Sequence, residues 1–139
     1  MTKQEMKQAV IKAIDDNKES IFAVKDSIYH DPEFGYKEVK TTATVADFLE
    51  NLGLNVERDI AVTGCMAHVN EDKAGPHIAV MGELDAVVVP GHALCNKETG
   101  AAHCCGHNAQ IASMVGVAYA LKDTGIMEEL DGDIVLMAV

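Results

Sequence analysis

The sequence lacks tryptophan and has only three tyrosines, three phenylalanines and three prolines in 139 residues. Basic residues are also scarce, because 11 lysines and arginines stand against 22 acidic residues and give a formal net charge of -11. An acidic surface repels phosphate backbones, so nucleic acid is excluded as an expected partner. No apolar run reaches the roughly 18 residues of a membrane-spanning helix, which argues against a membrane partner.

The N-terminal stretch MTKQEMKQAVIKAIDDNKES is charged and amphipathic, and it has no continuous apolar core of the kind found in signal peptides. We therefore predict a cytoplasmic protein. Without a secretion signal, four cysteines indicate reduced thiols, core residues or metal ligands rather than a disulfide framework. Cys65 lies in the strand-like VTGCMAHV and is expected to be a small buried side chain. The role of Cys95, in a polar loop, stays open.

The length and the 48% hydrophobic content are typical of one globular domain. Apolar residues at helical intervals predict a first helix that runs to about Tyr29 and a second near Lys37 to Leu52. The period then changes, and NVERDI, GCMAHVN and HIAVMGEL are typical of three short strands. Because IAVM in the third is apolar on both faces, we expect that strand to be central in its sheet.

A long loop without structure of its own is predicted from Asp85 to His103, and loops of that length are often functional. A helix from about Asn108 to Asp123 and a last strand, DIVLMAV, follow it. This order of elements predicts the α/β class, as a layered α/β/α domain with a mixed sheet. An apolar, central strand is an unusual end for a domain, so residues 1–139 are expected to be part of a larger one.

The segment HCCGH gathers metal-binding side chains just before the predicted helix. Cys105 and His107 are two residues apart across a glycine, and a thiolate and an imidazole at that spacing can reach one divalent ion. Two ligands do not complete a site, and two alternatives stay open on spacing alone. The side chains can be packing residues, or Cys105 can be a thiolate stabilised by the helix dipole.

The segment GELDA follows the third predicted strand, at the edge where open α/β sheets place their ligands. Glu83 and Asp85 share one face if the strand continues through both. Asp85 is the better candidate because it begins the loop that leads to HCCGH, although a carboxylate that caps a turn is a nearly equal alternative.

The other histidines carry weaker signals. His30 is expected to interact with the dipole of its helix. His68 and His77 lie in or beside strands and are assigned structural roles. His92, in the long loop, is a weak candidate for substrate contact.

The ordered segments DPEFGYKEVKTTATVADFLENLGLNV, GELDA and HCCGHNAQIASMVGVAYAL resemble the N-terminal third of the metal-dependent amidohydrolases related to aminoacylase and carboxypeptidase G. The resemblance is strongest to the subgroup of auxin-conjugate hydrolases and p-aminobenzoyl-glutamate hydrolase, and it covers nearly the whole chain. It implies a truncated zinc-peptidase-like catalytic domain over residues 1–139, without the lid and dimerisation domain of the family.

In that family a His-Ala-Cys-Gly-His stretch supplies two metal ligands, which correspond here to Cys105 and His107. Asp85 matches the family aspartate that supports the metal site and is our candidate catalytic residue. Glu83 occupies the place where other branches carry a metal-binding histidine, so direct ligation by Glu83 is open. Cys104 departs from the usual alanine.

The resemblance implies a divalent metal, zinc or manganese, that activates water for attack on the amide of a small N-acyl amino acid or peptide-like substrate. The family's general-base Glu-Glu pair follows a strand that resembles DIVLMAV, whereas Glu128 and Glu129 precede that strand. We therefore predict that the full-length parent is an amidohydrolase and that the 139-residue chain has little or no activity.

Two other functions remain as alternatives. One is a non-catalytic metal-binding or assembly module. The other is a redox protein that uses Cys104 and Cys105, which is less favoured because adjacent cysteines form strained disulfides. An uncovered apolar last strand also predicts a homo-oligomer, with copy-to-copy contacts at Asp133 to Val139.

Overall fold

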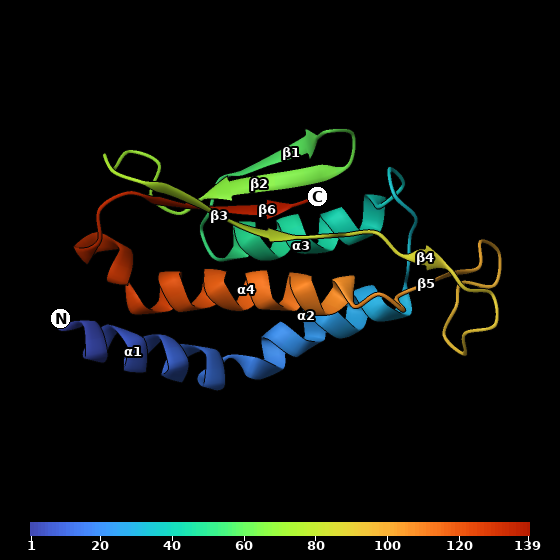
Figure 1. Ribbon diagram of the computed structural model, residues 1–139, viewed down its shortest axis with the longest axis horizontal. Coiled ribbons are helices and arrows are strands. Elements are labelled where there is room, and N and C mark those ends of the chain that lie inside the picture. The colour runs from blue at the N-terminus through green and yellow to red at the C-terminus, as the bar shows by residue number, and fades with distance from the viewer.

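The computed structural model describes residues 1–139 and contains a four-stranded sheet and a two-stranded sheet (Figure 1). The helices are α1 (Lys3–Asp16), α2 (Lys18–His30), α3 (Val39–Asn51), α4 (His107–Thr124) and the short 3-10 helix η1 (Ile126–Glu129). The strands are β1 (Val56–Ile60), β2 (Gly64–His68), β3 (His77–Gly82), β4 (Val87–Val88), β5 (Ala101–Ala102) and β6 (Asp133–Ala138). The predicted α/β class with a mixed sheet is confirmed.

The predicted first helix is in fact two helices, α1 and α2, which meet at Asn17 and change direction there (Figure 1). Thr2 begins α1 with a capping box, in which Thr2 and Glu5 satisfy each other's backbone N–H groups. The side-chain amide of Asn17 donates to the Ala13 carbonyl oxygen at 2.8 Å. A short polar side chain that bonds the preceding turn competes with regular helix, which explains the break.

The larger sheet has the order β1-β2-β6-β3, in which β3 and β6 are parallel and the other neighbours are antiparallel. The prediction that the third strand, β3, is central is therefore wrong. It lies at the edge of the sheet, and both Ile78 and Met81 are exposed. An apolar run on both faces indicates burial in general but does not identify which neighbours a strand pairs with.

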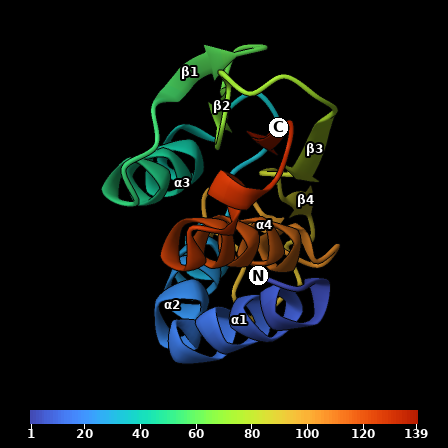
Figure 2. The same cartoon turned by 90° about the vertical axis from the view of Figure 1, so that its left-hand side faces the viewer.

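The helices pack in layers on the sheet (Figures 1 and 2). α3 contacts β1 and β2, and α4 contacts β3 and β6. α1 and α2 pack on the side of α4 that faces away from the sheet, below α4 in Figure 2, so α4 is covered on two sides. This position explains the apolar stripe of α4, where Ile111, Met114 and Val115 are fully buried. The predicted helix of about Asn108 to Asp123 is confirmed, and no helix has the length and apolar character that a membrane crossing requires.

The predicted long loop carries structure that the sequence did not reveal. β4 and β5 pair as an antiparallel ribbon, with Val87 opposite Ala102. Asn96 closes its tip, because the Asn96 N–H donates to the Ala101 carbonyl at 2.8 Å and the Gly100 N–H donates to the Asn96 carbonyl at 2.8 Å. Two-residue strands are too short to leave an alternating pattern, so sequence periodicity could not detect them. The ribbon joins β3 to the start of α4.

Candidate metal centre

One imidazole lies between two carboxylates where β3 ends and α4 begins. His107 is the first residue of α4 and is buried, whereas Glu83 and Asp85 follow β3. Asp85 Oδ1 lies 2.7 Å from His107 Nδ1, and the Asp85 carbonyl oxygen lies 2.9 Å from the same nitrogen. Glu83 Oε2 lies 3.0 Å from His107 Nε2. The structure therefore brings Asp85, Glu83 and His107 together, from two segments that the sequence analysis singled out separately.

These contacts determine which nitrogen of His107 is available to a ligand. Both oxygens near Nδ1 are acceptors, so Nδ1 carries the proton and donates it to Asp85. Nε2 then directs a lone pair at the Glu83 carboxylate, and the two atoms repel unless a proton or a cation lies between them. Metal-bound histidines typically have their other nitrogen fixed by a carboxylate in this way. The donor set therefore fits a divalent cation.

Gln110 holds Glu83 in place and was missed by the sequence analysis. Its side-chain amide donates to Glu83 Oε2 at 3.1 Å, and its Oε1 accepts the Glu83 backbone N–H at 3.1 Å. Gln110 lies three residues after His107 on α4, so the two side chains point to the same face of the helix. That spacing was the available signal, and it becomes informative only when Glu83 is known to lie beside α4.

The DPEFG segment supports Asp85 from the other side. The Ala86 N–H donates to the Glu33 carbonyl at 2.7 Å, and Phe34 forms an isolated parallel bridge with Ala86. The Glu33 carboxylate in turn accepts the Thr41 N–H and hydroxyl, each at 2.8 Å, at the first turn of α3. These bonds satisfy donors at a helix start and attach it to the segment that carries Asp85. They connect DPEFG to the residues of GELDA and to the start of α3.

Both cysteines of the HCCGH segment lie at the surface. Cys104 and Cys105 are exposed, free thiols, whereas Cys65 and Cys95 are buried. One group of three histidine, cysteine or acidic residues has all its ligand atoms within 4.8 Å of one another, and it lies elsewhere in the fold. Cys105, His107 and a carboxylate therefore do not form such a group. Shared binding of an ion by Cys105 and His107 therefore stays a prediction.

His103 is the least satisfied polar side chain of this region. Its ring is buried, and neither nitrogen has a hydrogen-bond partner. Burial lowers the pKa of His103, the nearby His107 lowers it further, and Asp85 opposes both effects. An unpaired, buried imidazole lowers the stability of a fold. The unsatisfied donor and acceptor of this ring lie two residues before Cys105. No role was predicted for His103 from its place in HCCGH.

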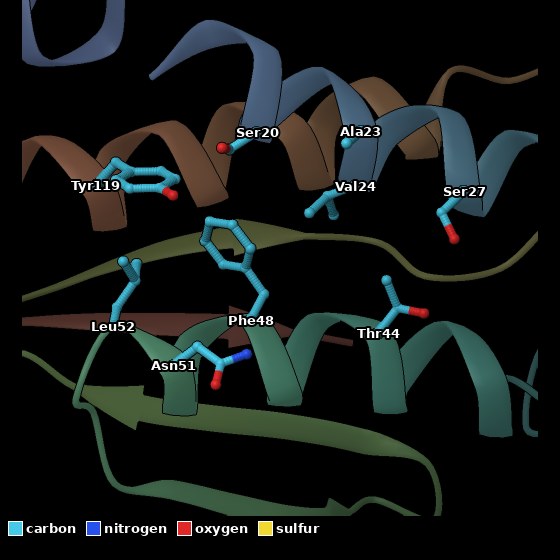
Figure 3. Close-up of a pocket in the computed structure, with 9 residues that line it drawn as sticks. All are labelled: Ser20, Ala23, Val24, Ser27, Thr44, Phe48, Asn51, Leu52 and Tyr119. Atoms are coloured by element: carbon cyan, nitrogen blue, oxygen red, sulfur yellow. The ribbon is translucent and has the colours of Figure 1, made fainter. Parts of the chain in front are cut away.

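A cavity of about 250 Å³ adjoins the two carboxylates. Its lining combines acidic side chains with backbone from the β1–β2 turn and consists of Tyr36, Glu38, Ile60, Ala61, Thr63, Gly64, Glu83, Asp85 and Val139. A larger groove of about 460 Å³ lies between α2 and α3, with Phe48 and Tyr119 facing each other in it (Figure 3). No candidate metal ligand lines that groove. The smaller cavity is therefore the one that chemistry at Asp85 and Glu83 can use.

The remaining histidines lie apart from this centre. His30 Nδ1 donates to the Asp26 carbonyl at 2.7 Å within α2, in keeping with a helix-end residue. His92 Nδ1 accepts the Leu94 N–H at 3.1 Å, and its ring meets that of Tyr29 edge to face. His68 and His77 meet at the opposite end of the sheet.

Comparison with known proteins gives related sequences but no matching protein-family model. The chain is similar to IAA-amino acid hydrolase ILR1-like 5 of Arabidopsis thaliana, with 32% identity over 117 residues, 82% of this chain and 26% of that protein. It is also similar to thermostable carboxypeptidase 2 of Saccharolobus solfataricus, with 31% identity over 105 residues, 73% of this chain and 27% of that protein. The chain therefore spans about a quarter of the length of these relatives.

Solved structures share the fold. One is a dinuclear metal-binding peptidase of the M20 family from Bacillus subtilis, with a TM-score of 0.73 and 25% identity over 86% of this chain and 34% of that one. Another is an aminobenzoyl-glutamate utilization protein from Klebsiella pneumoniae, with a TM-score of 0.70 over 93% of this chain and 38% of that one. The second is only 18% identical, so it supports the fold alone.

Proposed function

Because the chain belongs to the family of amidohydrolases and carboxypeptidases that these relatives represent, we propose that it supplies part of a metal centre for amide hydrolysis. Residues 1–139 would be the N-terminal part of the catalytic domain. The proposed substrates are N-acyl amino acids or small peptide-like amides. An N-acetyl-L-cysteine deacetylase of Bacillus subtilis, 28% identical over 84% of this chain, supports that class.

One observation carries the proposal: His107 is fixed by Asp85 at Nδ1 and faces the Glu83 carboxylate at Nε2. A buried imidazole that points its free nitrogen at an anion is suited to bind a cation between the two. The distance of 3.0 Å is short enough for small side-chain movements to admit the ion. The family likeness and the acidic cavity beside Glu83 and Asp85 support the same assignment.

In the proposed centre, His107, Cys105 and Glu83 would hold a zinc or manganese ion. When bound, such an ion would activate water and polarise the amide carbonyl of the substrate. Asp85 would keep the proton on His107 Nδ1 and fix the orientation of the ring, and Gln110 would fix Glu83. The resemblance assigns the general base to a Glu-Glu pair outside these elements, so residues 1–139 alone should hydrolyse little or no N-acetyl amino acid.

A thiol-protection experiment tests the metal assignment locally. In a Cys104→Ser variant, Cys105 is the one exposed thiol, because Cys65 and Cys95 are buried. We expect Cys105 to react quickly with a disulfide reagent in EDTA, and at least tenfold more slowly with zinc or manganese present. Adding His107→Ala should remove this protection, whereas the matched His92→Ala change should retain it. Equal protection in both variants would exclude a site shared by Cys105 and His107.

Assembly is a second candidate function, favoured by the exposed edge strand. The expected contact at Asp133 to Val139 assumed an uncovered strand, whereas β6 pairs on both sides and Leu136 is fully buried. The outer edge of β3 has no partner strand, and its Ile78 is exposed. We place a homo-oligomer contact on β3, because unpaired strand edges favour pairing with another chain.

Light scattering of Ile78→Lys tests this placement. The variant should lower the association of the chain, and Ile11→Lys, at an equally exposed position on α1, should leave it unchanged. A wild-type chain that is monomeric at high concentration, or equal effects of the two changes, would rule out the β3 contact.

A further inference from the structure

We propose that His68, His77 and Asp133 form a second metal site, of a zinc-binding type, at the end of the sheet opposite the His107 centre. Their ligand atoms all lie within 4.8 Å of one another. They come from the end of β2 and the starts of β3 and β6, at the left in Figure 1, whereas His107 lies where α4 begins, near β4 and β5. The site is independent of the proposed hydrolytic function.

The register of the three strands brings these ligands together. β3 and β6 are parallel, with His77 opposite Asp133. β2 is antiparallel to β6 on its other side, with His68 opposite Val135. Residues two apart on a strand share one face of the sheet, so Val135 and Asp133 point the same way and His68 is a diagonal neighbour of Asp133. The sheet itself therefore holds the three ligands, from segments up to 65 residues apart in sequence.

The distances suit a small cation with little rearrangement. Asp133 Oδ2 lies 2.5 Å from His68 Nδ1 and 3.6 Å from His77 Nδ1. Around a tetrahedral zinc ion with bonds near 2.0–2.2 Å, ligand atoms are roughly 3.3 Å apart. His77 is already near that separation, and His68 needs a movement of under about 1 Å. Two imidazoles and one carboxylate are ligands typical of zinc, whereas magnesium and calcium prefer oxygen ligands alone.

The surroundings of Asp133 orient its carboxylate as an anionic metal ligand. Its carboxylate is fully buried, and Oδ1 accepts the Asn70 backbone N–H at 2.8 Å, which leaves Oδ2 directed at the histidines. Burial is unfavourable for a charged carboxylate, and the bonds to His68 and Asn70 compensate for it. The nearby cation, Lys73, is engaged elsewhere, because Nζ donates to the carbonyls of Met127, Glu128 and Leu130.

An ordinary ion pair between Asp133 and His68 does not explain why His77 also lies beside the same carboxylate. The Asp133 carboxylate lies at hydrogen-bond distance from one ring, that of His68, whereas the His77 ring is 3.6 Å away and makes no hydrogen bond to it. A cation held by Asp133 can take a nitrogen lone pair from each ring. The exposed His77 ring leaves a path for the ion and room for a bound water.

Zinc titration followed by thermal unfolding tests the site. The chain would carry Cys104→Ser, Cys105→Ser and His107→Gln throughout, which removes the thiol and imidazole ligands of the other proposed centre and leaves Glu83 alone there. Zinc should raise the unfolding midpoint of this protein, because a ligand that binds only the folded state stabilises it. Adding His77→Gln should weaken zinc binding on the order of a hundredfold, since changes around a metal typically cost at least 10- to 100-fold. The matched His92→Gln change should have no effect.

His77 is the informative position because its ring makes no hydrogen bond within 3.5 Å and is largely exposed, so the metal-free variant should unfold at the unchanged midpoint. A zinc shift of equal size in the His77→Gln and His92→Gln proteins would overturn the proposal. Absence of any zinc shift in the parent would also overturn it. If the His107→Gln background does not fold, Cys105→Ser alone with the same His77 and His92 pair gives the same comparison, because only loss of the His77 contribution is scored.

Discussion

The two ends of the sheet contain the same kinds of side chain in opposite arrangements. At the end where α4 begins, a buried imidazole, His107, lies between the partly exposed carboxylates of Glu83 and Asp85. At the other end, the fully buried carboxylate of Asp133 lies between the partly exposed rings of His68 and His77. The first arrangement has two carboxylates around one ring, and the second has one carboxylate between two rings.

Because of this difference, the exposed carboxylates at the His107 end can attract a cation at little cost to the fold, whereas the buried carboxylate at the other end is important for stability. Exposed carboxylates such as Glu83 interact with water when no ion is present, so their loss costs the fold little. A buried carboxylate such as Asp133 must be satisfied by the protein itself, and removing it leaves its partners unpaired. We therefore expect substitution of Asp133 itself to reduce stability strongly, and substitutions of the carboxylates at the His107 end to affect metal binding more than folding.

Gly132→Ala should produce the largest loss of stability. Gly132 precedes Asp133 at φ +88°, and a Cβ there would lie 2.2 Å from the Pro76 carbonyl oxygen. That oxygen accepts the Asp133 N–H, so the clash separates the starts of β3 and β6. Left-handed strain and overpacking together predict a loss of about 4 kcal/mol in the free energy of unfolding in urea. Gly91→Ala, where a Cβ meets nothing within 4 Å, is the control.

Asp133→Ala should cost about 3 kcal/mol, because it leaves the Asn70 N–H and the His68 ring without a charged acceptor. Asp85→Ala, at a carboxylate that is about one-third exposed, should cost about 1 kcal/mol. Urea unfolding of both variants in EDTA measures the difference. Equal losses would contradict the contrast between a buried and an exposed carboxylate.

The fold was predictable where local patterns determine it. Apolar residues at helical intervals predicted helix in the N-terminal segment, and the predicted helix from about Asn108 corresponds to α4. The sequence did not predict the break at Asn17, which depends on one side-chain bond, or the edge position of β3. An apolar strand pattern reports burial, whereas strand order depends on pairing between distant segments.

The same reasoning explains which site residues were found. Cys105 and His107 are close in sequence, and Asp85 follows a strand, so short motifs indicated all three. Gln110 acts on Glu83, 27 residues away, and the cluster of His68, His77 and Asp133 depends on the register of three strands. No local pattern encodes a register, so His68 and His77 were assigned separate structural roles although the structure brings them together.

The apolar core under the sheet supplies a third point of comparison, because Cys65 on β2 is buried in it. Burial raises the pKa of Cys65 to about 11, from an ordinary value of 9.0. The folded state therefore favours the neutral thiol. The contribution of this thiol to the free energy of unfolding is fully present below pH 9 and is lost as the pH rises toward 11. The wild type should lose about 2 kcal/mol more than Cys65→Ala over this range in urea unfolding.

Cys104→Ser is the control for the alkaline experiment, since Cys104 is exposed and should leave the pH dependence unchanged. Lysines and tyrosines titrate in all three proteins, so the difference between them isolates the buried thiol. Identical slopes for wild type and Cys65→Ala would contradict burial of this thiol in the apolar core.

Gln110→Ala should have the smallest effect on stability and still alter the His107 end. Gln110 makes two bonds to Glu83 at the surface, where water can replace both, so the free energy of unfolding should change by about 0.5 kcal/mol or less. Without this tether the Glu83 carboxylate can turn away from His107 Nε2, and zinc protection of Cys105 should require roughly tenfold more zinc. Ser113→Ala, one turn further along α4, removes only a hydroxyl that bonds the Ala109 carbonyl and should leave protection unchanged. Unchanged protection in Gln110→Ala would show that Glu83 takes no part in holding the ion.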